Sequence, residues 1–543
     1  MTTFMFDCSV KFTAGVALLM FLAALAQVGE SGSTVASEVV AYDSRTQITQ
    51  HDIVPLMLLR CAVCHGGRCK EAGLDLRTKA AMLKGGKSGP AVVPGKPEES
   101  LIIKRIEAIE MPPRRELVRV SIKPMEMEEL AKLKTWIAKG LPESPQTADI
   151  ATTQHDPLVT DEDRAFWSFQ PPRARTPPRV NQSIRMQNAI DAFVIKRLEV
   201  QQLDLAPEAD RWALVRRVYF DLTGLPPSPE DIVAFVTDAD PLAYEKLVER
   251  LLASPRYGER WGRYLLDAVG YADSEGGENS DRVRPHMWRY RDYVVQAFNV
   301  DKPYDRLLHE QIAGDELAEY ENAELITQEL YDNLVATGFL RTAPDRTFAN
   351  ITNFVPERLE VIADEIQIFG SAVLGLTLQC ARCHTHKFDP IPQRDYYRLA
   401  AVFKDALDEH DWLKPQGPRT LNFVTTEERT AWEDHKAPID QQVERLQNKI
   451  EAEQNEEKKK RLQEQLTQLE SQRKPEPQIR ALWARGEPSP TYILKRGNYL
   501  TPGREVGPGV LTVLTRDATP FVHEPPWQNA KKTGRRLGLA RWL

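Results

Sequence analysis

Apolar side chains recur at helical spacing along most of this 543-residue chain. An apolar run at residues 53–59 predicts a short buried helix that leads straight into Cys61. Further along, apolar positions are separated by steps of three and four residues, which is the spacing of one helix face. These stripes are Leu130, Leu133, Trp136 and Ile137, then Ile190, Phe193, Val194 and Leu198, and then Leu359, Ile362, Ile366, Phe369 and Val373. The pattern therefore predicts a mainly α fold.

Two later segments have a different pattern. Residues 427–475 are strongly charged, and their apolar positions return every three or four residues on either side of a polar gap at 451–461. Each side covers only about two heptads, less than an independent coiled coil needs. We therefore expect a coiled-coil-like helical arm that folds back on itself, with a dimerising rod as the alternative. Residues 476–543 alternate and contain many turn residues, which predicts short strands and loops.

These patterns divide the chain into successive parts. We expect a signal peptide at 1–26, a small helical domain at 46–141, a proline-rich linker at 142–187, a larger helical domain at 188–406, the charged helical hairpin at 427–475, and a loop and strand segment at 476–543. The last helical pattern, at 533–543, stops in mid-pattern, so we expect the chain to be the front part of a longer protein.

The N-terminus has the features of an export signal. Lys11 precedes an apolar run at 12–26, and Ala24-Leu25-Ala26 fits the small-x-small cleavage pattern. About 15 apolar residues is short for a spanning helix, so a cleaved signal is favoured over an anchor. We expect an exported, periplasmic or otherwise extracytoplasmic protein, soluble or peripheral, with no integral membrane segment after cleavage. The net charge of −7, with mixed signs, argues against a nucleic-acid partner.

Two copies of C-x-x-C-H are the main chemical signal. They are Cys61, Cys64 and His65, and then Cys380, Cys383 and His384. In c-type haem attachment, two thiolates add to the haem vinyl groups and the histidine becomes an axial iron ligand. With 6 Cys and 10 His in the chain, a single random match has an expected frequency of roughly 0.001, so two are hard to ascribe to chance. We predict haem c at both motifs.

Each haem also needs a second axial ligand if it is to shuttle electrons without binding small molecules. Met111, in a proline-stiffened Glu110-Met111-Pro112-Pro113 loop, is the candidate for the first haem, in competition with Met82, Met125 and Met127. For the second, His386 is too near His384 along the backbone to reach the opposite face. His286, His309 and His410 remain, or the position is open to small molecules.

Zinc is the alternative metal. Cys69 could complete a Cys3His site with the first motif, and His386 a Cys2His2 site with the second, since zinc takes four N or S ligands at short spacings. Otherwise Cys69 is expected to be a buried thiol, with an intermolecular disulfide or a role at the iron as the alternatives. An acidic loop at 271–281 either binds a cation or sugar or is simply solvated. The sequence contains no G-x-S-x-G, phosphate loop or H-E-x-x-H, so common hydrolase and nucleotide functions have no support.

Several stretches resemble known bacterial domains. Residues 52–140 resemble the planctomycete cytochrome c type domain through CAVCH at 61–65, GLDLR at 73–77, PGKPEES at 94–100 and MPP at 111–113. Residues 167–400 resemble the DUF1549 domain through WSFQPP at 167–172, DLTGLPP at 221–227, YADS at 271–274, WRYRD at 288–292, QIAGD at 311–315 and GLTLQCARCH at 375–384. Residues 533–543 resemble the opening of a DUF1553 domain.

This resemblance implies exported, haem-binding proteins. It carries over Cys61, Cys64, His65, Cys380, Cys383 and His384 as haem residues, and Met111 as the further ligand. We expect a dihaem c-type cytochrome that carries electrons to or from a redox partner protein of unknown identity. The chain also remains open to two other functions: a haem-dependent oxidoreductase acting on a carbohydrate-type substrate, and a zinc or structural scaffold that docks through the charged arm.

Overall fold

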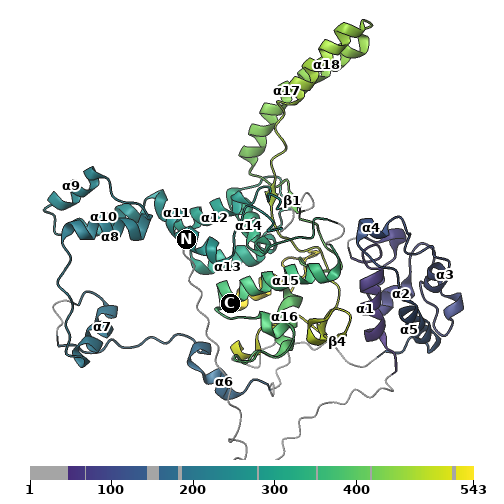
Figure 1. The fold of residues 1–543 in the computed structure, drawn as a ribbon, viewed down its shortest axis with the longest axis horizontal. Helices are drawn as coiled ribbons and strands as arrows, with labels where there is room; N and C mark the ends of the chain where they lie inside the picture. Colours follow the sequence, from purple (N-terminus) through teal and green to yellow (C-terminus); the bar gives the residue numbers. More distant parts are fainter. Residues whose placement is uncertain are drawn as a thin grey trace, which may run out of the picture. The chain divides into compact units, whose positions relative to one another are not determined.

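The computed structural model describes residues 47–67, 69–143, 158–181, 186–277, 281–349, 353–415, 419–515 and 521–543. The predicted signal peptide at 1–26 lies outside these residues, as does part of the predicted linker. Within them, no helix is both long enough and apolar enough to cross a membrane. Helices dominate the described residues, and their strands form two antiparallel sheets of two strands each (Figure 1). The predicted mainly α fold is confirmed.

The first unit is built from five helices around its own hydrophobic core. They are α1 (Gln50–Arg60), α2 (Lys79–Lys84), α3 (Leu101–Glu107), α4 (Leu117–Val120) and α5 (Met127–Ala138). Leu133, Trp136 and Ile137 are fully buried, as the predicted stripe on α5 requires. Arg60, at the end of α1, donates to both carboxylate oxygens of Glu129 on α5 at 2.9 and 3.0 Å. This bidentate pair holds the end of α1 in place directly before Cys61.

A small lobe of three helices follows two separate helices. After α6 (Asp161–Ala165) and α7 (Ala189–Val200), the lobe comprises α8 (Arg211–Thr223), α9 (Pro229–Thr237) and α10 (Ala243–Leu252). The stripe predicted for α7 is not its buried face: Ile190 is 71% exposed and Phe193 is 43% exposed, whereas Ala192 and Ile195 are buried. Apolar residues lie all round this helix, so spacing alone does not select the face that packs.

The largest core joins helices from the middle of the chain to its C-terminal segment. The helices are α11 (Pro255–Ala268), α12 (Trp288–Asn299), α13 (Tyr304–Ala313), α14 (Gln328–Ala336), α15 (Val355–Phe369) and α16 (Gln393–Phe403), with α19 (Arg535–Trp542) at the end of the sequence. Ile362, Ile366 and Phe369 of the predicted α15 stripe are buried in this core. Leu482 and Leu539, far along the sequence, belong to the same core.

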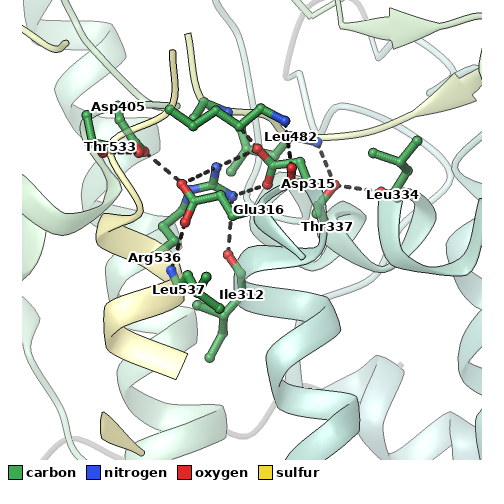
Figure 2. Close-up of polar contacts among 12 residues, drawn as sticks. Ile312, Asp315, Glu316, Leu334, Thr337, Asp405, Leu482, Thr533, Arg536 and Leu537 are labelled. Carbon is green, nitrogen blue, oxygen red and sulfur yellow. Dashed lines mark hydrogen bonds and ion pairs between the residues drawn. The ribbon is translucent and has the colours of Figure 1, made fainter. Parts of the chain in front are cut away.

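A buried ionic network joins α19 to this body (Figure 2). The Arg536 guanidinium has no exposed surface and donates to both carboxylate oxygens of Asp315 at 2.7 and 2.9 Å. It also lies 3.3 Å from Asp405 and 3.4 Å from Glu316. Burial acts to raise the pKa of Asp315, but Arg536 outweighs it and holds that pKa below its usual value. The C-terminal helix is therefore held by charge pairing as well as by apolar packing.

The charged segment forms a helical hairpin. Helices α17 (Thr426–Ala452) and α18 (Glu456–Glu470) pack against each other, with the bend inside the predicted polar gap (Figure 1). Only Ile439 and Val443 are buried among its apolar positions. At its base, β1 (Thr420–Leu421) pairs antiparallel with β2 (Ile479–Arg480). The fold-back is confirmed, and the coiled-coil character of the arm stays a prediction.

Candidate functional site

The first motif is a tight turn at the end of α1. The Cys61 amide continues the helical pattern by donating to Met57 O at 2.8 Å. The amides of Cys64 and His65 then both donate to Cys61 O, at 3.2 and 2.9 Å. A side chain at Gly66 would place its Cβ only 2.2 Å from Ala62 O, so the turn requires glycine directly after the histidine.

Both thiols and the imidazole of this motif line one cavity. The cavity has a volume of about 250 Å³, which is near the lower end of the roughly 300–1,000 Å³ that ligand pockets usually measure. Most of the remaining wall is aliphatic, including Leu74, Leu76, Ala91, Ile102 and Ile106. A planar apolar group would therefore be shielded from water while it is held next to Cys61, Cys64 and His65.

The electrostatics of the cavity keep the three groups neutral. Burial raises the pKa of the Cys61 thiol to about 12, with a further contribution from Cys64. Burial also raises the pKa of Cys64 and lowers that of His65. Among the described residues, the buried Nδ1 of His65 has no hydrogen-bond partner. Two protonated thiols and a neutral imidazole with an unpaired nitrogen fit the residues that haem c requires.

The four methionines that are candidate ligands for the first haem differ in whether they line the cavity. Met111 is 37% exposed and lines the cavity, and Met125 lines it as well. Met82 is fully buried in the core of the unit, and Met127 is 81% exposed. Neither Met82 nor Met127 is part of the cavity wall. The candidates for a thioether ligand are thereby reduced to Met111 and Met125.

The second motif repeats the backbone turn of the first. It follows α15 and begins inside the short 3-10 helix η9 (Gln379–Arg382), and the amides of Cys383 and His384 donate to Cys380 O at 3.2 and 3.4 Å. Upstream, the Gln367 side-chain oxygen accepts from the amides of Leu378 and Gln379, each at 2.9 Å. The same five-residue pattern thus gives the same local geometry in two unrelated surroundings.

Those surroundings leave the second motif open. Cys380, Cys383 and His384 are all exposed, and the motif is anchored through its middle residues. Arg382 O accepts from the Tyr397 hydroxyl at 2.8 Å and from Gln393 Nε2 at 3.0 Å. His384 Nδ1 lies 2.7 Å from Thr385 O. Since a carbonyl only accepts, Nδ1 carries the proton and Nε2 keeps the lone pair that binds a metal.

The residues weighed for zinc are used otherwise. His386 is 8% exposed, and its Nδ1 accepts from the amides of Asp389 at 2.8 Å and Phe388 at 3.3 Å, so the ring closes its own loop. Cys69 Sγ lies 3.6 Å from Glu71 Oε1. In the part of the chain that the structure describes, no three His, Cys, Asp or Glu side chains are grouped to hold a metal ion.

The structure also places the acidic loop at 271–281 and the histidines that were candidate ligands for the second motif. In the acidic loop, Glu275 is fully buried and pairs with Arg284 at 3.0 Å and Arg480 at 2.8 Å, so this carboxylate is neither solvated nor open to a ligand. Among the histidines weighed for the second motif, His410 lines a cavity that also reaches Arg382, whereas His309 Nδ1 lies 2.8 Å from Asp305 O.

Sequence reasoning missed the residues that hold each motif from outside. Arg60 and Glu129 secure the first turn, while Gln393 and Tyr397 secure the second. These residues are far from each other in the sequence, or from the motif that they hold, and no periodic pattern connects them. Such contacts depend on how the helices pack. For Arg60 the sequence gives one hint, because this charged residue stands between the apolar run at 53–59 and Cys61.

Comparison with known families agrees with this geometry. The family model described as Planctomycete cytochrome C matches residues 61–115, a span that begins at Cys61 and includes Met111. The model described as Protein of unknown function (DUF1549) matches residues 189–408, which contain the second motif. No curated protein and no solved structure matches the chain. The resemblance of residues 533–543 to DUF1553 stays a prediction. The chain thus contains a region that matches the Planctomycete cytochrome C model, followed by a region that matches the DUF1549 model.

Proposed function

We propose that this protein is an exported c-type cytochrome that carries electrons on two haems, one at each C-x-x-C-H motif. The observation that carries the proposal is the first cavity, whose mostly apolar wall includes two thiols, an imidazole with an unpaired nitrogen and Met111. Haem c would supply reversible one-electron chemistry at such a site.

Each residue has a defined part in this proposal. Cys61 and Cys64 would hold the macrocycle covalently, and His65 and Met111 would bind its iron. The aliphatic wall excludes water, and a thioether ligand raises the reduction potential relative to a second imidazole. At the second motif Cys380, Cys383 and His384 would take the same parts.

Haem counting in paired cysteine variants tests the proposal. The full chain is produced with its N-terminus in a host that attaches haem outside the cytoplasm, and haem per chain is measured by mass and by absorption of the reduced form. We expect two haems, with Cys61→Ser/Cys64→Ser and Cys380→Ser/Cys383→Ser each removing one. Cys69→Ser is the matched control and should keep both. A chain that holds zinc and shows no reduced c-haem α-band would contradict the proposal.

A second candidate function rests on the exposure of the second motif. Because its face is open and His386 is engaged within its own loop, a haem there has room for a substrate or small ligand on one side. The chain would then be an oxidoreductase, with a carbohydrate-type substrate. Carbon monoxide or cyanide binding at one haem and not the other would favour this function, whereas two ligand-inert six-coordinate haems would exclude it.

A further inference from the structure

Three buried arginines come from segments that contact one another inside the large helical body, and we call them the buried arginine cluster. They are Arg341, Arg419 and Arg480, which are 4%, 2% and 4% exposed. Thr420, directly after Arg419, pairs with Arg480 between strands β1 and β2. The Leu482 amide donates to the Thr337 hydroxyl at 2.8 Å, which ties the segment after β2 to the 3-10 helix η6 (Thr337–Arg341).

Two members of the cluster have carboxylate partners. Arg480 donates to both oxygens of Glu275 at 2.8 and 3.3 Å, and Arg284 shares the same carboxylate at 3.0 Å. Arg419 Nη1 lies 2.5 Å from Asp345 Oδ2. Glu275 thus faces two guanidinium groups and Asp345 faces one, so these two carboxylates do not outnumber the cations that they already serve.

The third member, Arg341, has no partner in the part of the chain that the structure describes. Its side chain forms neither a hydrogen bond nor an ion pair there, and its Nε is buried. Within the same residues, Arg419 Nη2 and Arg480 Nε are also buried without a hydrogen-bond partner. Burial, together with repulsion by Arg419 and Arg480, lowers the pKa of Arg341 well below its usual value. An unpaired buried cation is costly, because it has lost water and gained no acceptor.

Glu365 does not neutralise Arg341. Among the described residues Glu365 Oε2 has no hydrogen-bond partner, and Oε1 accepts from the Ala343 amide at 2.9 Å. Burial raises the pKa of Glu365 to about 7, so this carboxyl group is about half protonated at neutral pH. Three guanidinium groups of like charge, each with a buried nitrogen that lacks an acceptor, therefore call for an anion from outside the chain.

We propose that Arg341, Arg419 and Arg480 form a binding site for a small anion. The ligand is a halide or a compact inorganic oxyanion, because it has to accept hydrogen bonds from guanidinium groups and fit within a closely packed core. Binding neutralises Arg341 and joins η6 to the β1–β2 pair. The site includes no residue of either C-x-x-C-H motif, so it does not depend on the proposed function.

Stability in different salts tests the site in the full chain. Thermal unfolding is followed at constant pH and ionic strength in sodium chloride, sulfate and phosphate, with gluconate as an anion too large to enter. The wild type should show a saturable rise of about 2 °C or more in the unfolding midpoint with at least one small anion, because a ligand that binds only the folded state stabilises it. Equal midpoints in all of these salts would overturn the proposal.

Arg341→Met separates specific binding from a general salt effect. The variant keeps an unbranched apolar stem but loses the charge and its donors, so the anion concentration for half-maximal stabilisation should rise roughly tenfold or more. An anion response that is the same in this variant as in the wild type would overturn the proposal. Arg346→Met, at an exposed arginine nearby in the sequence, is the matched control and should respond as the wild type does.

Stability in gluconate distinguishes the site from pairing within the protein. Without a small anion, Arg341→Met should be more stable than the wild type, because it no longer buries an unpaired charge. A variant that is less stable in every salt would show that Arg341 pairs with Glu365, and would reject the site. If Arg341→Met does not accumulate, wild-type crystals soaked in bromide or in selenate provide the test by anomalous scattering. A peak among the three arginines in either soak supports the site, and none in both rejects it.

Discussion

At the scale of single residues, the cavity of the first motif contains two thioethers, of which one is predicted to be the ligand. Met111→Ala should lower the reduction potential of the first haem by roughly 100 mV or more, because the axial ligand is a main determinant of that potential. Potentiometric titration measures the change, with Met125→Ala as the matched control from the same wall. If the control variant shows the loss and Met111→Ala does not, the ligand is Met125.

The buried carboxyl group of Glu365 makes the stability of the fold depend on pH. It is 4% exposed, its Oε1 accepts from the Ala343 amide at 2.9 Å, and burial raises its pKa to about 7. A raised folded-state pKa means that the folded chain binds this proton more tightly than the unfolded chain. Its contribution to stability is therefore complete below the unfolded-state pKa near 4.5 and declines as pH rises towards 7.

Glu365→Gln should remove this dependence. The amide keeps the acceptor oxygen but carries no charge, so the variant should gain on the order of 3 kcal/mol over the wild type at pH 8 and little at pH 4.5. Denaturant unfolding at the two pH values measures the difference. Glu98→Gln, at a side chain that is 78% exposed, should show no such pattern. Equal effects at both pH values would show that ionisation of Glu365 is not the cause.

At the scale of elements, the helical arm has few buried residues beyond its base. Beyond Trp432, whose Nε1 donates to Lys474 O at 3.1 Å, its buried residues are Ile439 and Val443. Its base is closed independently by the pairing of Thr420 with Arg480. The arm should therefore fold locally, and the body should not depend on it.

Replacing residues 437–470 with a short Gly-Ser turn tests this independence. We expect unchanged haem spectra and a change of less than about 3 °C in the midpoint of thermal unfolding. The same variant examines the scaffold function, because loss of a co-purifying partner with intact spectra would assign docking to the arm. A body that no longer folds would show instead that the arm is part of its core.

At the scale of the whole molecule, the buried network around Arg536 makes the C-terminal segment part of the body (Figure 2). Arg536→Met would leave Asp315 and Asp405 buried without their cation, and removing one partner of a buried pair usually costs about 3–5 kcal/mol. The expected result is a loss of that size in the free energy of unfolding, measured by denaturant titration. Arg541→Met, at an exposed position on the same helix, is the control and should be nearly neutral.

The sequence by itself determined the helical class, the folded-back arm, the short strands near the C-terminus and the positions of the two motifs. All of these depend on local spacing or on hydrogen bonds within a few residues, as the shared Cys61 and Cys380 carbonyl turns show. The sequence could not predict that α7 packs through Ala192 and Ile195, that the first motif lines a cavity while the second is exposed, or that Tyr492 enters the core of the first unit. Only the tertiary structure decided these points, because each depends on which distant segments pack together, and neither periodicity nor motif spacing contains that information.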